Sequence, residues 1–226
     1  MAIVSSANRT CASEDLLEMY RSVKYIASTT MNIVVPVISL YFLVMAIRKL
    51  CSQSIIQYST RVMLVATLLF ATCHQVGYIF AKGDILITIL FKLSDPCNLQ
   101  RTSYECRFIS IAQTTGNCGM VFIQISMSID RALNLTFPTS YLKLKAKPGI
   151  VLTFISFLTS FSMWFFLTIN DPLTGYLNHC WFYPAGSVRQ FNILLYVCSG
   201  ISVCNVIADT ILLKFAEREI EYFKKK

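Results

Sequence analysis

The polar side chains that could do chemistry are concentrated in one stretch, from Cys106 to Arg131. No charged residue lies between Arg107 and Asp130, yet polar side chains recur there at helical spacing, in line with both ends of the stretch. They are Ser110, Gln113, Asn117, Gln124 and Ser128. The stretch therefore predicts a helix with one polar face. Amides and hydroxyls on such a face support hydrogen bonding, either to a small ligand or to a neighbouring helix.

Catalytic and metal-binding patterns are not evident in the sequence. No Ser-His-Asp set, pair of catalytic carboxylates or glycine-rich phosphate loop can be placed on one aqueous face. His179 stands beside Cys180, but no Cys-x-x-Cys spacing accompanies the pair, so a metal site is not favoured. We expect a protein that is not an enzyme and that carries no metal and no cofactor.

The composition is typical of an integral membrane protein. Of 226 residues, 55% are hydrophobic and only 14% are charged. Helices of about 20 apolar residues can cross a bilayer, and five such runs are predicted: 25–47, 62–80, 106–131, 150–169 and 191–213. The predicted fold is all-α, an antiparallel transmembrane helix bundle formed by residues 25–213, with a tail at 214–226. The polar face of the third run must turn toward protein or water, which predicts a central position for it.

The distribution of basic residues predicts the orientation of the bundle. Twelve of the twenty Lys and Arg residues fall on the side that is cytoplasmic if the N-terminus, residues 1–24, is extracellular. Loops rich in these residues stay in the cytoplasm. The net charge of +8 is thereby explained, and no basic face suited to nucleic acid is visible. We expect a multi-pass membrane protein with the lipid bilayer as its surroundings.

The outer side of this topology collects four of the nine cysteines, namely Cys11, Cys97, Cys106 and Cys180. An even number in an oxidising compartment favours disulfides, and four cysteines allow three pairings. Asn8 begins an Asn-x-Thr sequon and is the candidate for glycosylation on the same side.

Taken together, several segments resemble the rhodopsin-type G-protein-coupled receptors, and in detail the nematode chemoreceptors of serpentine receptor class alpha. The segments are CASEDL, SDPCNLQRTSYECRFISIAQTTGNCG, MSIDRALNLTFPTSYLKLKAKPGI and NDPLTGYLNHCWFYP. The resemblance implies disulfides between Cys106 and Cys180 and, by elimination, between Cys11 and Cys97. It also implies that Arg131 meets a heterotrimeric G protein while Asp130 restrains it at rest.

The same resemblance implies a receptor for small chemical ligands in the plasma membrane of sensory neurons. The candidate ligand-binding residues are His74, Gln113, Asn117 and Trp181. For the two amides, hydrogen bonding between helices is the alternative role, and for His74 it is ordinary packing. Receptors of this type have seven spans and five are visible here, so the pattern predicts a chain truncated after the fifth span that couples no ligand to a G protein alone.

Two other functions fit part of the pattern. The first is a non-signalling membrane partner of full-length receptors, which the five visible spans favour. The second is a transporter or channel subunit, since such proteins place ionisable groups within their spans. Apart from Asp130 at the end of the third run, the only acidic residue inside a predicted span is Asp209, near its inner end and one turn from Asn205.

Overall fold

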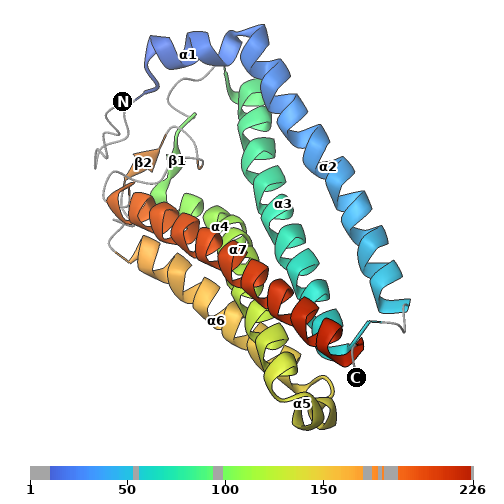
Figure 1. The fold of residues 1–226 in the computed structure, drawn as a ribbon. Coiled ribbons are helices and arrows are strands. Elements are labelled where there is room, and N and C mark those ends of the chain that lie inside the picture. The colour runs from blue at the N-terminus through green and yellow to red at the C-terminus, as the bar shows by residue number, and fades with distance from the viewer. Residues whose placement is uncertain are drawn as a thin grey trace.

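Long helices lying side by side dominate the computed structural model (Figure 1), which describes residues 11–52, 56–93, 99–169, 175–177, 180 and 188–224. The helices are α1 (Glu14–Arg21), α2 (Val23–Ser52), α3 (Tyr58–Lys92), α4 (Ser103–Thr136), α5 (Pro138–Leu144), α6 (Lys147–Thr168) and α7 (Val188–Lys224). Two short strands, β1 (Arg101–Thr102) and β2 (Tyr176–Leu177), pair in antiparallel fashion. The prediction of an all-α membrane bundle is confirmed.

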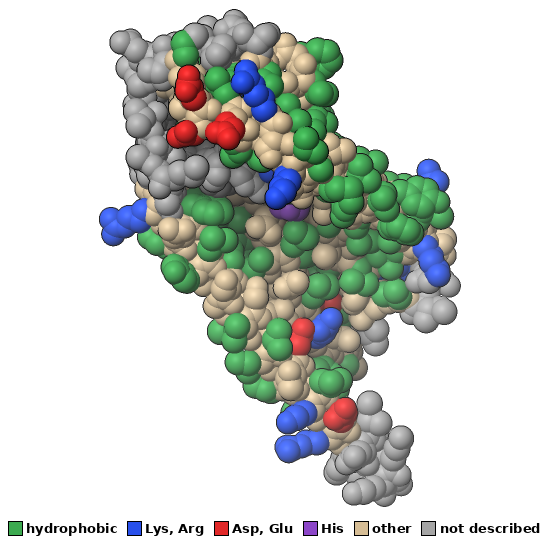
Figure 2. All heavy atoms as spheres, turned by 90° about the horizontal axis from the view of Figure 1, so that it is seen from above, with side chains coloured by type: hydrophobic (Ala, Val, Ile, Leu, Met, Phe, Trp, Pro, Cys, Tyr) green, Lys and Arg blue, Asp and Glu red, His purple; other side chains and the backbone are tan. Residues whose placement is uncertain are grey.

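Four of these helices are long and apolar enough to cross a membrane: α2, α3, α6 and the segment Arg189–Arg218 of α7. Large hydrophobic side chains are exposed along all four, as expected of surfaces that face lipid. Figure 2 agrees, because most of the visible surface is hydrophobic or uncharged and the charged side chains stand in small, separate groups. The helix α4 has 34 residues and is not among the four, which reflects the polar residues along it.

The central position expected for residues 106–131 is the one that α4 occupies. It packs against α3, α6 and α7. One apolar cluster joins Ile123 to Phe70 and Met63 of α3, and another joins Cys118 to Leu167 of α6 and Leu194 of α7. These side chains lie on different faces of α4 and leave a remaining face for its polar stripe.

Two glycines bring α3 and α4 into backbone contact. A Cβ atom added at Gly116 would lie 2.5 Å from the backbone nitrogen of His74, and one added at Gly77 would lie 2.7 Å from that of Gln113. A larger residue at either position would force the helices apart, so this seam depends on residues without side chains.

The start of α4 is fixed by a reciprocal cap. The Thr102 hydroxyl accepts a hydrogen bond from the Glu105 backbone N–H at 3.2 Å, and the Glu105 carboxylate accepts one from the Thr102 backbone N–H at 3.2 Å. This capping box satisfies two backbone donors that the first turn of a helix otherwise leaves unpaired. Next to it, Arg101 of β1 pairs with Leu177 of β2, so the segment before α7 lies against the start of α4.

Several elements extend beyond the predicted spans or lie outside them. The helix α3 continues to Lys92 and α7 to Lys224, well past the apolar runs that were predicted. The N-terminal region contains α1, whose Ser13 hydroxyl accepts a hydrogen bond from the Leu16 backbone N–H at 3.4 Å. The short helix α5 begins at Pro138, a residue suited to the first turn because it has no N–H to leave unpaired.

Candidate functional site

The C-terminal end of α4 carries a buried carboxylate, Asp130, only 2% exposed. The Ser59 hydroxyl donates to it at 2.6 Å and the Thr60 hydroxyl at 3.4 Å, both from the start of α3. The Tyr141 hydroxyl of α5 donates to it as well. Burial of a charge is tolerated when such donors surround it. Asp130 therefore holds α3, α4 and α5 together at this end of the bundle.

The next residue, Arg131, points to a different helix. Its guanidinium lies 3.0 Å from a carboxylate oxygen of Asp209 in α7, and the two side chains are 50% and 35% exposed. The Ser128 hydroxyl, one turn earlier in α4, lies 2.7 Å from the same Asp209 oxygen and 2.7 Å from the side-chain oxygen of Asn205. Three polar residues of α4 and α7 thus converge around Asp209.

This arrangement differs from the one that the resemblance implied. There Asp130 was the expected restraint on Arg131, whereas in the structure Asp130 is bonded to hydroxyl groups and the ion pair of Arg131 is with Asp209. One signal of this contact is present in the sequence, since Asn205 and Asp209 are one helical turn apart and share a face. It could not show which helix that face would meet.

The N-terminal half of α4 brings two of the candidate ligand-binding residues together. The ring nitrogen Nδ1 of His74 lies 3.1 Å from the backbone carbonyl oxygen of Gln113, an arrangement in which Nδ1 carries the proton and donates. Both side chains are half-buried, whereas Asn117, one turn further along α4, is exposed. Trp181 lies outside the described residues, as does the glycosylation candidate Asn8.

The rest of the polar stripe divides between bonded and exposed residues. Near the N-terminal end of α4, the Ser110 hydroxyl accepts a hydrogen bond from the Trp164 indole of α6 at 3.4 Å. Near the C-terminal end, Ser128 is bonded to α7. Between them Asn117 and Gln124 are both exposed. The ends of the stripe therefore join helices, and its middle presents amides to the surroundings.

The predicted disulfide between Cys106 and Cys180 is present, with the two Cα atoms 4.5 Å apart. It links the start of α4 to the segment before α7, beside the pairing of β1 with β2. Cys11 is also disulfide-bonded, but Cys97 lies outside the described residues, so that pairing stays a prediction. In the described part of the chain, no group of three or more His, Cys, Asp or Glu side chains is placed to hold a metal ion.

Comparison with known proteins places this architecture in a family. The family model described as serpentine type 7TM GPCR chemoreceptor Sra matches residues 6–226. Serpentine receptor class alpha-13 of Caenorhabditis elegans is 59% identical over 97% of this chain and 66% of its own length, and the protein of that name in Caenorhabditis briggsae is 58% identical over the same shares. Class alpha-11 of Caenorhabditis elegans is 33% identical over 93% of this chain and 63% of its own length.

The chain thus spans about two thirds of the length of these relatives, and the match extends over nearly all of its own residues. The family resemblance predicted from the cysteine, Asp-Arg and loop motifs is confirmed. This chain belongs to the Sra family of serpentine, seven-transmembrane-type chemoreceptors.

Proposed function

We propose that this chain is part of a G-protein-coupled chemoreceptor. In this proposal it binds the ligand, and its central helix α4 connects the ligand site to the site of G-protein coupling. The observation that carries the proposal is the position of α4, which connects a half-buried polar group at its outer half, His74 with Gln113, to the Arg131–Asp209 pair at its inner end. A ligand bound near one end of α4 can affect the other end only if the bundle has two packed arrangements and the ligand favours one of them.

The proposed topology has the N-terminus outside and five membrane crossings, α2, α3, α4, α6 and α7. Although α4 is less apolar than the other four, its central position supports a crossing, because three helices shield most of its surface from lipid. In this orientation the disulfide and the two short strands are extracellular, and the Arg131–Asp209 pair is at the cytoplasmic boundary. The proposed setting is the plasma membrane of a sensory neuron.

In the proposed mechanism, a small chemical ligand forms hydrogen bonds with His74, Gln113 and Asn117. At rest the guanidinium of Arg131 is paired with Asp209, so it must leave that carboxylate before it can pair with a partner protein. Ligand binding favours an arrangement in which α7 moves relative to α4 and the ion pair opens. The guanidinium, which stays charged at all physiological pH values, then becomes available to a heterotrimeric G protein.

The exposure of Asn117 and Gln124 supports a second candidate function, association with further transmembrane helices. Side-chain amides facing hydrocarbon are costly, and helices that supply hydrogen-bond partners remove that cost. Such helices can belong to a full-length receptor with which this chain assembles as a non-signalling partner.

The test uses a chimera in which the corresponding C-terminal third of the class alpha-13 relative follows Lys226. G-protein activation without ligand is measured in cells by energy transfer between labelled G-protein subunits, with surface expression matched. Asp209→Asn should raise this basal signal, because it releases Arg131, and Arg131→Ala should abolish it. Equal signals from the chimera and both variants would overturn the proposed coupling role. If the chimera signals and the 226-residue chain alone does not, the result would favour the second candidate function for the chain by itself, that of a non-signalling partner of a full-length receptor.

A further inference from the structure

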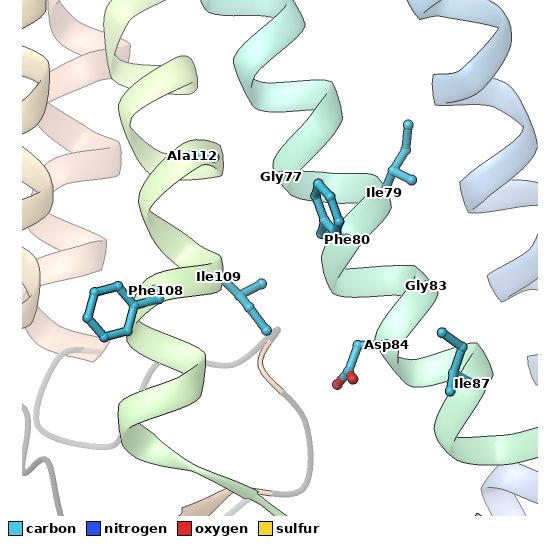
Figure 3. Close-up of a pocket in the computed structure, with 9 residues that line it drawn as sticks. All are labelled: Gly77, Ile79, Phe80, Gly83, Asp84, Ile87, Phe108, Ile109 and Ala112. Atoms are coloured by element: carbon cyan, nitrogen blue, oxygen red, sulfur yellow. The ribbon is translucent and has the colours of Figure 1, made fainter. Parts of the chain in front are cut away.

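A groove of about 590 Å³ lies between α3 and α4, near the outer end of both helices. Figure 3 shows its lining: Gly77, Phe80 and Gly83 on α3, and Phe108, Ile109 and Ala112 on α4, with the Asp84 carboxylate in the gap between the two helices. Its volume is in the range of cavities that hold a small molecule. All nine lining residues except Asp84 are apolar or glycine.

The groove is separate from the polar face of α4 that the proposed function uses. Phe108 and Asn117 are nine residues apart, which at about 100° per residue places them on opposite sides of the helix. The groove does adjoin Gln113 through Gly77 and Ala112, but neither His74 nor Gln113 is among its lining residues.

The one charged side chain in the groove is already neutralised. The Arg101 guanidinium donates from Nε to Asp84 at 2.9 Å and from a second nitrogen to the other carboxylate oxygen. A carboxylate has about four acceptor positions, so Asp84 can accept a further hydrogen bond. Because the pair has no net charge, the groove favours a neutral donor such as a hydroxyl group over an ammonium ion. For the same reason the pair offers no net charge to attract a phosphate group.

The polar and apolar ends of the groove are ordered along the membrane normal. Seven residues of helix separate Gly77 from Asp84, a rise of about 10 Å. If the N-terminus is outside, as in the proposed topology, α3 runs outward from Tyr58 to Lys92 and Asp84 is nearer the outer surface. The groove then has a hydrogen-bond acceptor toward the headgroups and an apolar wall extending into the hydrocarbon.

The wall also has the shape for a broad, rigid body. A Cβ atom added at Gly83 would meet nothing within 4 Å, so open space stands where a side chain would be. Phe80 and Phe108, which also line the groove, are 68% and 54% exposed. We propose that the groove binds a membrane sterol, with its hydroxyl donating to Asp84 and its fused rings lying over Gly83 against the apolar wall.

The experiment uses the whole chain purified into lipid nanodiscs that contain a diazirine-bearing cholesterol analogue. After illumination, labelled peptides are quantified by mass spectrometry, with excess cholesterol or its 3α-hydroxyl epimer as competitor. We expect labelling to concentrate on residues 77–87 and 108–112 and cholesterol to compete for it. The epimer should compete about fivefold less well, as the loss of one hydrogen bond predicts.

The variant Gly83→Leu fills the groove and should remove the labelling. Its matched control is Gly200→Leu in α7, another helical glycine at which an added Cβ would meet nothing within 4 Å. Ile87→Trp is a second variant that fills the same groove. Size-exclusion profiles and the state of the Cys106–Cys180 disulfide verify folding.

The proposal is overturned by undiminished labelling in both folded filling variants, by equal labelling of all lipid-facing helices, or by equal competition from the epimer. It is also overturned if diazirine-bearing palmitic acid labels the same peptides and cholesterol does not displace it, since an acyl chain would then occupy the groove. No signalling is measured, so the outcome is independent of the proposed coupling to a G protein.

Discussion

Arg131 and Asp209 are joined by an ion pair 3.0 Å long that connects the C-terminal end of α4 to the C-terminal half of α7. The Ser128 hydroxyl lies 2.7 Å from the same carboxylate oxygen, so the pair belongs to a small network. Both charged side chains are partly exposed, and exposed pairs contribute little to stability. If this contact strongly affects signalling, the reason would be its position between α4 and α7, because its contribution to the free energy of unfolding is small.

A double-mutant cycle tests this weakness directly. Arg131→Gln, Asp209→Asn and the double variant should show a coupling free energy of about 0.2–1 kcal/mol in thermal or denaturant unfolding of the purified chain. A coupling well above that range would mean that the pair is a structural clamp, and its proposed role as an easily opened restraint would have to be abandoned.

The disulfide predicts a larger effect. Cys180→Ala should reduce both thermal stability and delivery to the cell surface, because removal of a native crosslink costs about 2–5 kcal/mol in small secreted domains. Cys204→Ala, which removes an exposed thiol that forms no disulfide, is the control and should have little effect. Peptide mapping of the mature protein provides a separate check: free thiols at both Cys106 and Cys180 would refute the crosslink.

The seam between α3 and α4 should tolerate no side chain at Gly116. Gly116→Val places a Cβ atom 2.5 Å from the His74 nitrogen and 2.7 Å from the Phe70 carbonyl oxygen. Overpacking of this kind costs about 1–3 kcal/mol, and the melting temperature in detergent should fall accordingly. Gly200→Val supplies the matched substitution in an open position of α7, and a similar loss there would show that the effect is not one of helix contact.

The buried hydroxyl of Tyr20 should make the folded chain less stable at alkaline pH. Tyr20 is 1% exposed and packs with Ile85, Ile89 and Leu99, and burial, followed by the charges of Tyr25 and Asp84, raises the pKa of its hydroxyl. The folded chain then holds this proton more tightly than the unfolded chain does, so the contribution is complete below the unfolded pKa, about 10, and is lost as the pH rises above it.

Tyr20→Phe should therefore reduce the drop in melting temperature between neutral pH and pH values above about 10. The comparison is made between the two proteins at each pH, which subtracts the titration of other tyrosines and lysines. Parallel curves for the two proteins would contradict the assigned role of Tyr20.

The topology can be tested with reporter fusions. Reporters placed after Lys49, Lys147 and Lys226 should all report the cytosol, because basic residues near these positions favour that side. A luminal signal after Lys147 would exclude the proposed membrane crossing by α4.

The features that could be predicted from sequence are those that depend on local spacing. The polar face of α4 could be predicted because a helix repeats every 3.6 residues. The central position of α4 could be predicted because side-chain amides are costly in lipid. The Cys106–Cys180 link was readable only through the family resemblance, since four outer cysteines permit three pairings.

What could not be predicted depends on how distant segments cross. The partner of Arg131 is 78 positions away and is determined by the angle at which α7 meets α4. The Asp84–Arg101 pair depends on the path of the connection after α3. The two-residue strands have too few residues to show an alternating pattern, and α1 is only 8 residues long.

The glycine seam has a mechanical consequence. At Gly77 and Gly116 the backbones of α3 and α4 are in contact, so no side chain lies between them that could change rotamer and accommodate a displacement. The two helices should therefore move together as one rigid unit. The contact between α4 and α7 is of another kind, because it combines the side-chain packing of Cys118 with Leu194 and the polar contacts of Ser128 and Arg131 with Asp209. Motion within the bundle should therefore occur mainly as a shift of α7 relative to the α3–α4 pair. The size of that shift is limited by how far Asp209 can move before its ion pair with Arg131 breaks.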